Sequence, residues 1–411
     1  MKTTLASEFL NTSDGKEAEE IISRCTHCGF CLATCPTYQL LGDELDGPRG
    51  RIYQMKQVLE GAEPTRETQL HLDRCLTCLA CETTCPSGVQ YGHLLEIGRR
   101  VVETKVERPA EQRRPRTLLR HGLTSPLFGP AMRVGQSVRG LLPSTLKAKV
   151  PERRGPGAWP RGHHARKVLL LEGCVQPSMI PNINAATARV LDAAGIECVL
   201  PRGQGCCGAI KYHLADQKGG LKNMRTNIKA WWPYVESGAV EAVVINASGC
   251  GAMVKEYGHA LRGDARYAEK AARITALARD ISELLPDIAR ALAGRVRPPE
   301  GIFAWHEPCT LQHAQQLSGV VPRGLAALGF DLRPAAQEAN ICCGAAGTYS
   351  VLQPELSVQL RDRKLGHLQG DTAAERPRAI LSANIGCITH LQSGTDVPVR
   401  HWIEVLDEAL A

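Results

Sequence analysis

The sequence predicts an α+β multidomain protein in which an α-helical N-terminal part is followed by two tandem α/β repeats. Three observations lead to this expectation. Two cysteine runs near the N-terminus are joined by a segment with helical spacing and poor strand signals. The C-terminal part twice repeats a strand, a helix and a second strand around a Cys-Cys-Gly motif. A stretch rich in proline, glycine and arginine separates the two parts.

The N-terminal part holds two closely similar cysteine runs. The first reads CTHCGFCLATCP over residues 25–36, and the second reads CLTCLACETTCP over residues 75–86. Each has the spacing C-x2-C-x2-C-x3-C-P, which is typical of a pair of [4Fe-4S] clusters. Structural zinc usually shows separated C-x2-C pairs, and disulfides need an oxidising compartment, of which the sequence gives no sign. The runs therefore predict an electron carrier.

The motif also predicts which cysteines bind which cluster, because the fourth cysteine of each run ligates the other cluster. The expected ligands are Cys25, Cys28, Cys31 and Cys85 for the first cluster, and Cys75, Cys78, Cys81 and Cys35 for the second. This crossover would join two distant segments, so that metal binding would stabilise the fold. Arg49 and Arg51, between the runs, are expected either to offset the charge of a reduced cluster or to be surface charges. His27, inside the first loop, is expected to be a donor to cluster sulfur or a solvated side chain.

Four segments follow from composition and patterning. Residues 1–110 are expected to be an α-helical ferredoxin domain with both clusters, in which Ile52, Met55 and Val58 lie at helical spacing and residues 91–106 form a further helix. Residues 111–165 read as a basic Pro/Gly-rich linker, residues 166–297 as the first Cys-Cys-Gly repeat, and residues 298–411 as the second.

The basic segment carries most of the positive charge. Residues 111–167 contain 13 lysines and arginines against two acids, whereas the whole chain has a net charge of +7. This segment is either a solvated connector or a docking surface for an acidic partner or an anionic membrane face. No aromatic-interleaved basic platform accompanies the charge, so we expect no nucleic-acid partner.

The two repeats predict βαβ halves with parallel strands, packed by pseudo-twofold symmetry. The segments KVLLLEGC and GIFAWHEPC open the halves as buried strands, and helices are expected over residues 182–194 and 311–328. Second strands follow at IECVL and DLRPA, and third strands at AVVINASGC and AILSANIGC.

Each repeat contributes four cysteines at expected strand ends and loops. The two sets are Cys174, Cys206, Cys207 and Cys250, and Cys309, Cys342, Cys343 and Cys387. They predict a third iron–sulfur centre, with one per half as a further option; a redox-active thiol pair, a zinc site or a degenerate repeat kept for packing are the alternatives. His306 and His313 would either tune or ligate such a centre or be hydrogen-bonded loop residues. The remaining Cys198 is expected to be a small buried apolar side chain.

No residue pattern for substrate chemistry is found. The chain lacks a P-loop, a nucleophile arrangement and a convincing flavin site, and the formal G-x-G-x-x-G match at residues 203–208 contains the vicinal cysteines. We therefore expect no catalytic residues in this chain, and electrons should arrive from a subunit that holds an organic cofactor. The N-terminus lacks a signal-peptide core and no apolar run reaches membrane-spanning length, so a cytoplasmic location is expected.

The motifs together resemble a known family. The twin cysteine runs followed by two Cys-Cys-Gly repeats are similar to the iron–sulfur subunits of bacterial respiratory dehydrogenases. Within that group, CVQPSMIPNINAATARVLDAAGIE, YHLADQ, NIKAWWP, HEPCTLQH and ICCGAAGTYS resemble the glycolate oxidase iron–sulfur subunit family over nearly the whole chain.

The resemblance implies a role in a complex. Partner flavoprotein subunits would oxidise glycolate to glyoxylate, and also D-lactate to pyruvate, and this subunit would pass the electrons to a quinone or another respiratory acceptor. The location implied is peripheral, on the cytoplasmic face of the inner membrane. Relatives of the heterodisulfide reductase type end each repeat with C-x2-C, whereas Cys250 and Cys387 here lack the second cysteine. The alternatives are the iron–sulfur subunit of an anaerobic glycerol-3-phosphate dehydrogenase and a heterodisulfide-reductase-like thiol/disulfide enzyme.

Overall fold

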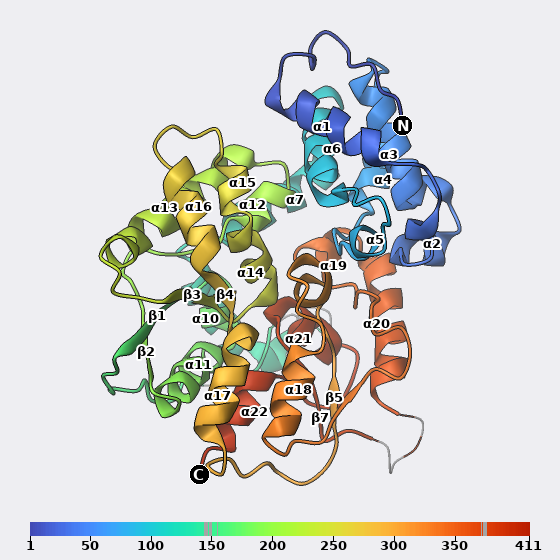
Figure 1. The fold of residues 1–411 in the computed structure, drawn as a ribbon. Helices are drawn as coiled ribbons and strands as arrows, with labels where there is room; N and C mark the ends of the chain where they lie inside the picture. The colour runs from blue at the N-terminus through green and yellow to red at the C-terminus, as the bar shows by residue number, and fades with distance from the viewer. Residues whose placement is uncertain (144–146, 148–149, 154, 371, 373–375) are drawn as a thin grey trace. The chain divides into compact units, whose positions relative to one another are not determined.

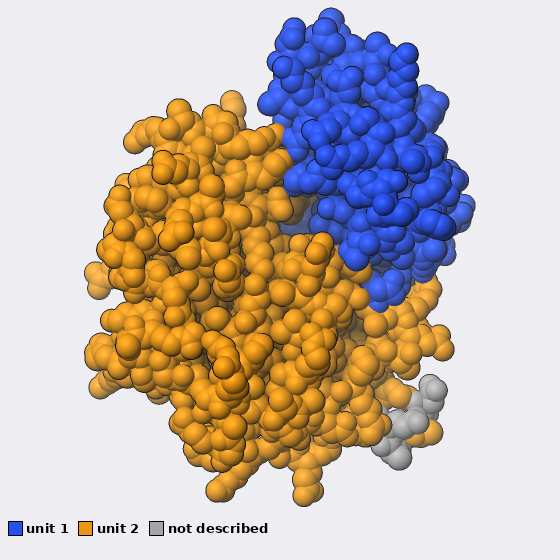
Figure 2. Space-filling model, in the orientation of Figure 1, with its two compact units in different colours: residues 1–117, 340–360 blue, residues 118–339, 361–411 orange. Residues whose placement is uncertain are grey.

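A computed structural model describes residues 1–143, 147, 150–153, 155–370, 372 and 376–411 (Figure 1). The chain divides into two compact units, coloured separately in Figure 2. The first unit comprises Met1–Thr117 and Asn340–Leu360, and the second comprises Leu118–Ala339 and Arg361–Ala411. The fold is α+β, with a helical ferredoxin-like region followed by two α/β halves, as the sequence predicts.

The first unit is helical. Its elements in residues 1–117 are α1 (Ser13–Arg24), η1 (Phe30–Leu32), α2 (Pro36–Leu41), η2 (Glu44–Asp46), α3 (Pro48–Leu59), α4 (Arg66–Asp73), α5 (Ala80–Thr83), α6 (Tyr91–Lys105) and the start of α7 (Ala110–Gly122). The segment 340–360 adds α19 (Tyr349–Leu352) and the start of α20 (Pro354–Leu368). No strand occurs in the part of this unit that the structure describes.

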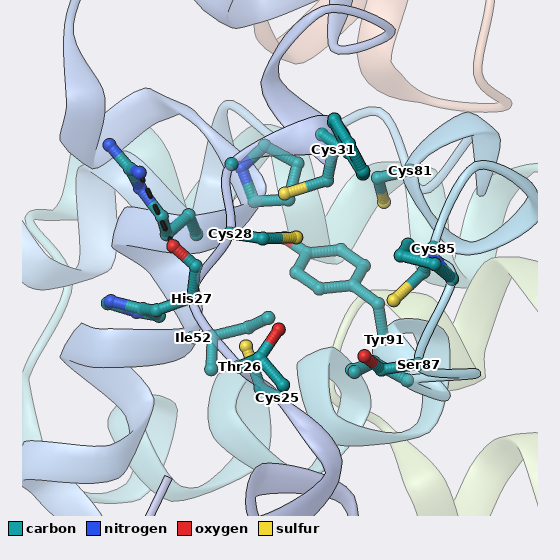
Figure 3. Close-up of a pocket in the computed structure, with 16 residues that line it drawn as sticks. Cys25, Thr26, His27, Cys28, Cys31, Ile52, Cys81, Cys85, Ser87 and Tyr91 are labelled. Atoms are coloured by element: carbon teal, nitrogen blue, oxygen red, sulfur yellow. Dashed lines mark hydrogen bonds between the residues drawn. The ribbon is translucent and has the colours of Figure 1, made fainter.

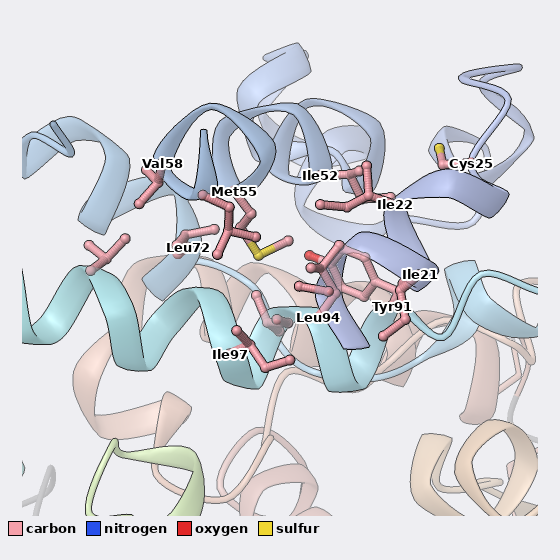
Figure 4. Packing of buried hydrophobic residues seen from close by; sticks show 14 of the residues in the cluster. Ile21, Ile22, Cys25, Ile52, Met55, Val58, Leu72, Tyr91, Leu94 and Ile97 are labelled. Carbon is pink, nitrogen blue, oxygen red and sulfur yellow. The ribbon is translucent and has the colours of Figure 1, made fainter. Parts of the chain in front are cut away.

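The core of this unit lies between α1, α3 and α6 (Figure 4). Ile22, Met55 and Leu94 are fully buried there, at positions that place one apolar face of each helix inward. The helices α3 and α6 approach closely at Gly98, where an added Cβ would lie 2.3 Å from Met55 Sδ. This packing holds the two cysteine loops, which flank the same helices.

The first α/β half is built on a parallel four-stranded sheet in the order β2-β1-β3-β4. The strands are β1 (Arg166–Leu170), β2 (Ile196–Val199), β3 (Ala242–Ile245) and β4 (Ala278–Asp280). Its helices are α10 (Gln176–Met179), α11 (Asn182–Ala193), α12 (Ala209–His213), α13 (Gln217–Glu236), α14 (Ser248–Lys255), α15 (Tyr257–Ala260), α16 (Ala268–Leu277), η4 (Ile281–Leu284) and α17 (Leu285–Leu292). The strand β3 is buried along its whole length, as expected for a parallel strand covered on both faces.

The second half repeats this topology with a parallel sheet in the order β6-β5-β7-β8. The strands are β5 (Phe303–Trp305), β6 (Leu332–Pro334), β7 (Ala379–Ser382) and β8 (Val399–His401). The other elements are the π-helical η5 (Thr310–Ala314), α18 (Val320–Ala327), α21 (Ile385–Gln392) and α22 (Trp402–Glu408).

The two halves pack reciprocally within the second unit. Helix α11 of the first half contacts α22 of the second, and α18 of the second contacts α17 of the first. Each pair joins the longer helix between the first two strands of one half to the last helix of the other half, which is the pattern of a pseudo-twofold axis. The loops that follow β3 and β7 also meet, because the Ser248 N–H donates to the Ala383 carbonyl oxygen at 3.0 Å.

The structure differs from the sequence-based expectation in two places. The single helix expected over residues 311–328 is broken between η5 and α18, where Gln316 and Gly319 both have positive φ. The Gly319 N–H donates to the Glu307 carboxylate at 2.7 Å rather than to a carbonyl oxygen of the preceding turn. Helix α18 begins directly after Gly319. The fourth strand of each sheet, β4 and β8, was not expected, because the sequence repeat predicts only three strands in each half.

The basic segment forms two helices in its described part. Helix α7 is followed, after Pro126, by α8 (Phe128–Ser137) and η3 (Arg139–Leu141). Residues 144–146, 148–149 and 154 of the expected linker lie outside the described residues. The four expected segment boundaries stay a prediction.

Candidate metal centres

The first cysteine loop wraps a hollow of about 440 Å³ that opens to solvent (Figure 3). Cys25, Cys28 and Cys31 line it from one side, and Cys85 of the second run lines it from the other, together with Cys81. The chain turns sharply after α1 because His27 and Gly29 both have positive φ. That turn lets three cysteines of a short loop face one hollow.

The second loop has the same backbone form. Thr77 and Leu79, two and four residues after Cys75, also have positive φ and so correspond to His27 and Gly29. This loop borders a smaller hollow of about 300 Å³ lined by Cys35, Cys75, Cys78 and Cys81.

The structure thus brings Cys85 beside the first run and Cys35 beside the second. Cys81 lines both hollows, so its position alone does not assign it to one of the two clusters. The exchange of Cys35 and Cys85 between the runs is the arrangement that the crossover ligation needs. The assignment of each cysteine to a cluster stays a prediction.

Three of these thiols lie in surroundings that disfavour a free thiolate. Burial raises the pKa of Cys25, raises that of Cys31 to about 11, and raises that of Cys81 well above its ordinary value. The exposed Cys28 differs, because the backbone N–H of Phe30 lowers its pKa. Buried thiols that share a hollow would lose their protons on binding iron, so the residues present fit [4Fe-4S] clusters.

A buried arginine lies beside the second hollow. Arg51 is 1% exposed and donates to the His71 carbonyl oxygen at 2.7 Å and to Thr37 Oγ1 at 3.1 Å. Burial acts to raise the pKa of Cys75, but the charges of Arg51 and Arg99 outweigh it and hold that pKa below the ordinary value. Of the two expectations for Arg51, the structure excludes a surface charge. Arg49 is half-buried and pairs with Glu44 at 2.6 Å.

Three further side chains contact the second cysteine set, and sequence reasoning missed all of them. Tyr91 OH donates to Cys75 Sγ at 3.5 Å, and Thr37 Oγ1 lies 3.3 Å from Cys35 Sγ. Arg99 donates to the carbonyl oxygen of Cys75 at 2.6 Å. The only local signal was the place of Thr37 two residues after a cysteine, since Tyr91 and Arg99 reach the site through the fold of α6.

The first Cys-Cys-Gly repeat brings its four thiols together. Cys174 follows β1, Cys206 and Cys207 precede α12, and Cys250 lies in the first turn of α14 after β3. Hydrogen bonds join Cys206 to Cys174 and to Cys207, and Cys207 to Cys250. These bonds hold the pKa of Cys206 well below its ordinary value and raise those of Cys174 and Cys207. The set lies at the carboxyl ends of parallel strands, where α/β proteins bind ligands.

The glycine after the vicinal pair is required by this geometry. Gly208 has φ +98°, and an added Cβ would lie 2.9 Å from the Gly220 carbonyl oxygen. Its N–H donates to Cys206 Sγ at 3.4 Å. The buried Asn227 also donates to the Cys206 carbonyl oxygen at 3.0 Å, so the loop is fixed from two sides.

The second set divides between the two units. Cys342 and Cys343 belong to the 340–360 segment of the first unit, whereas Cys309 and Cys387 belong to the second unit. The local form of the motif is the same as in the first repeat, because the Gly344 N–H donates to Cys342 Sγ at 3.4 Å. In the second unit, Asn384 Nδ2 donates to Cys387 Sγ at 3.5 Å.

The remaining candidates lie in the second unit. His306 is fully buried with Nδ1 2.9 Å from Ser382 Oγ, and burial lowers its pKa to about 3, so the ring is neutral. His313 is buried in η5. Cys198 in β2 is half-buried rather than buried as expected, and partial burial raises the pKa of its thiol to about 12. None of the helices in the described residues is both long enough and apolar enough to cross a bilayer.

Two protein-family models match the parts of the chain that contain these cysteines. Residues 21–89 match the 4Fe-4S dicluster domain, and residues 168–255 and 303–392 each match the cysteine-rich domain. The fold and the thiol arrangement define an electron-transfer protein that carries two [4Fe-4S] clusters and two cysteine-rich domains.

Curated relatives narrow the class. The chain is 52% identical to the glycolate oxidase iron-sulfur subunit of Escherichia coli K12, over 100% of this chain and 99% of the relative. It is 30% identical to the probable glycolate oxidase iron-sulfur subunit of Bacillus subtilis 168, over 95% and 92%. Lactate utilization protein A of Geobacillus thermodenitrificans is 29% identical over 59% of this chain and 98% of the relative. The chain belongs to the glycolate oxidase iron–sulfur subunit family, and is an iron–sulfur electron-transfer subunit of a hydroxyacid dehydrogenase.

Proposed function

We propose that this chain carries electrons from partner flavoprotein subunits, which oxidise glycolate to glyoxylate and also accept D-lactate, to a quinone or another respiratory acceptor. The observation that carries the proposal is the pair of cysteine-lined hollows in a chain that is 52% identical to a glycolate oxidase iron-sulfur subunit. A [4Fe-4S] cluster takes up and releases single electrons. The chain's own residues would hold the clusters, offset their charge and exclude water.

The ligand roles form part of the proposal. Cys25, Cys28, Cys31 and Cys85 would hold one cluster, and Cys35, Cys75, Cys78 and Cys81 would hold the other. The four hydrogen-bonded thiols of the first Cys-Cys-Gly repeat support a third iron–sulfur centre. A zinc site or a redox-active thiol pair would use the same cysteines. Iron, sulfide and zinc analysis of the Cys206→Ser variant separates these cases: loss of iron and sulfide indicates a cluster, loss of zinc a zinc site, and loss of neither a thiol pair.

The substrate is tested on the complex. Affinity purification of this chain from its native host should bring down flavoproteins, and adding glycolate anaerobically should produce the EPR signals of reduced clusters. D-lactate should also reduce the clusters, whereas glycerol 3-phosphate should not. Reduction by glycerol 3-phosphate alone would favour the anaerobic glycerol-3-phosphate dehydrogenase alternative. Disulfide reduction by the isolated chain with an artificial donor would favour the heterodisulfide-reductase-like alternative.

We also propose that the complex contacts an anionic membrane surface through the basic segment, on the cytoplasmic face of the inner membrane. Leu127 caps the start of α8, Val134 lies within α8 and Leu141 ends η3, so the three are seven residues apart. They are 73%, 65% and 87% exposed. No acidic residue occurs between Glu111 and Glu152, while Arg133 and Arg139 lie within this stretch. An exposed apolar stripe among arginines fits a helix that lies in the headgroup region of anionic lipid.

Vesicle sedimentation tests this contact. The purified chain should bind vesicles containing phosphatidylglycerol and not neutral phosphatidylcholine vesicles, and binding should weaken as salt is added. The double variant Leu127→Glu/Leu141→Glu should lose binding, whereas the control Leu10→Glu, at another exposed leucine, should keep it. Unchanged binding by the double variant would overturn the membrane contact, and loss of flavoprotein co-purification instead would assign the stripe to a partner subunit.

A further inference from the structure

Tyr91 belongs to both cysteine hollows. It is the first residue of α6, it is 3% exposed, and it lines the first hollow (Figure 3) as well as the second. Pro48 and Cys81 also line both hollows. All three residues lie within Met1–Thr117, so the boundary that the two hollows share is formed inside the first unit.

The hydroxyl of Tyr91 acts on one of the two cysteine sets. It donates to Cys75 Sγ at 3.5 Å, and the Thr77 N–H donates to the same sulfur at 3.4 Å. Cys75 lines the second hollow and is not among the residues that line the first. Because a thiolate that binds iron still accepts hydrogen bonds, both donors can also serve this sulfur as a cluster ligand.

The start of α6 holds this hydroxyl in place. The Gly92 N–H donates to Glu82 Oε2 at 3.0 Å, and Glu82 belongs to the second cysteine run. The Tyr91 N–H donates to the Val89 carbonyl oxygen at 2.8 Å, and the Tyr91 ring packs in the same buried core as Leu94 (Figure 4). The helix that carries Tyr91 is thus tied to the run whose first sulfur accepts from the hydroxyl.

A hydrogen bond to a ligand sulfur favours the reduced state of an iron–sulfur cluster. Reduction adds one negative charge to the cluster and its sulfurs, and a donor stabilises that charge. Tyr91 is buried beside the second hollow, together with the fully buried Arg51, which lines this hollow and not the first. Replacing the hydroxyl with hydrogen removes one of the two donors to Cys75 and leaves the charge of Arg51 in place.

We propose that Tyr91, acting through Cys75 as a positioning residue, sets the difference between the reduction potentials of the two clusters. Its hydroxyl raises the potential of the cluster held by the Cys75 set, although its side chain borders both sites. This difference drives the transfer of one electron from one cluster to the other. No bond forms or breaks in that step, and the hydroxyl keeps its proton. The inference rests on the proposed ligand sets.

Redox titration of the iron-loaded full chain tests this role. The potential is set with dithionite and mediators, and the EPR signals of the two reduced clusters are followed. Tyr91→Phe keeps the ring and removes the hydroxyl. It should make one cluster about tenfold harder to reduce, which is about 59 mV for a one-electron couple, and should shift the other clearly less. The affected signal should be the one that Cys35→Ser alters, because Cys35 lines the second hollow.

Tyr53→Phe is the matched control, because Tyr53 is an exposed tyrosine of the same unit that is not among the residues lining either hollow. Both potentials should stay at the parent values in this variant. Equal shifts of the two clusters in Tyr91→Phe, or no shift, would overturn the role of the hydroxyl. Loss of iron from Tyr91→Phe alone would also overturn it and would assign the hydroxyl to cluster assembly.

The outcome of this titration does not depend on the substrate, because no partner subunit takes part. A selective shift in Tyr91→Phe would stand even if glycolate failed to reduce the complex, and that failure would overturn the proposed function alone. A shift confined to the signal that Cys85→Ser alters would contradict an action of Tyr91 through Cys75, because Cys85 lines the first hollow.

Discussion

Arg51 donates a hydrogen bond to Thr37 Oγ1 at 3.1 Å, and Thr37 Oγ1 lies 3.3 Å from the sulfur of Cys35. A fully buried cation is thus linked through one hydroxyl to a cysteine of the second hollow. Asp46 lies 3.3 Å from the guanidinium of Arg51, but it also accepts from Arg74 at 2.8 Å, so one carboxylate faces two arginines. The second cluster site therefore retains positive charge that solvent does not screen.

Removing this charge should make the second cluster harder to reduce. Reduction adds an electron to an already anionic cluster, which a nearby buried cation favours. Arg51→Met should lower the midpoint potential of one cluster by about 60 mV or more, which is a tenfold change in the equilibrium of a one-electron couple. EPR-monitored redox titration measures the shift. The matched control is Arg49→Met, because Arg49 is half-buried and paired with Glu44, and its effect should be clearly smaller.

Replacing the fourth cysteine of one run with serine should damage the cluster bound by the first three cysteines of the other run. Cys85→Ser is expected to destroy or alter the cluster bound by Cys25, Cys28 and Cys31, since Cys85 lines their hollow. Cys35→Ser should affect the cluster of the Cys75 set. Iron analysis and EPR line shapes of the two variants distinguish the clusters. Damage to the run that contains the mutated cysteine, with the other run intact, would refute the crossover.

The glycine of the first Cys-Cys-Gly motif should tolerate no side chain. Gly208→Ala combines a left-handed backbone with a Cβ 2.9 Å from the Gly220 carbonyl oxygen. We expect it to cost more than the roughly 1–3 kcal/mol of backbone strain alone. Gly203→Ala is the control, because Gly203 has φ +86° in the same loop but nothing within 4 Å of an added Cβ. Thermal unfolding of both variants gives the difference, and equal losses would contradict the steric argument.

The buried His401, which joins the second α/β half to Asn246 of the first, should make the stability of the second unit fall in acid. Burial lowers the pKa of His401 to about 3, and its Nδ1 accepts from the Ile403 N–H at 3.1 Å while Nε2 lies 2.9 Å from the Asn246 carbonyl oxygen. Because the unfolded histidine takes up a proton near pH 6.5 and the folded one does not, stability is full above pH 6.5. It falls as the pH drops towards 3.

Urea unfolding of the His401→Gln variant tests this dependence. Between pH 6 and pH 5 the parent should lose up to about 1.4 kcal/mol that the variant does not lose. The variant is expected to be less stable than the parent at pH 7.5, since it disrupts the helix cap at α22. Parallel curves for the two proteins between pH 7 and pH 5 would exclude His401 as a source of acid sensitivity.

Much of the fold and the twin cysteine runs could be predicted from short stretches of sequence. The spacing of the twin runs is a property of two short loops, and the positive φ at His27 and Thr77 shows that both loops adopt one form. The central strands β1, β3, β5 and β7 were recognisable as short, mainly apolar runs before a cysteine. By contrast, β4 and β8 are three-residue strands that lie outside the repeated pattern of strands and cysteines.

The rest depends on contacts between distant segments. Arg51 and Tyr91 reach the Cys75 set because α3 and α6 pack together, and nothing in their local sequence marks that contact. Tyr349 contacts Arg74 across 275 residues of sequence. The inclusion of Cys342 in the first unit could not be inferred from a repeat that reads as one continuous half.

The most direct test of the central claim is low-temperature EPR of the anaerobically purified complex before and after adding glycolate. We expect iron and sulfide for at least two [4Fe-4S] clusters in this chain, with their reduced signals appearing once glycolate is added and disappearing when a quinone follows. Clusters that stay oxidised while the partner flavin is fully reduced by glycolate, or a chain without iron beyond trace, would contradict it.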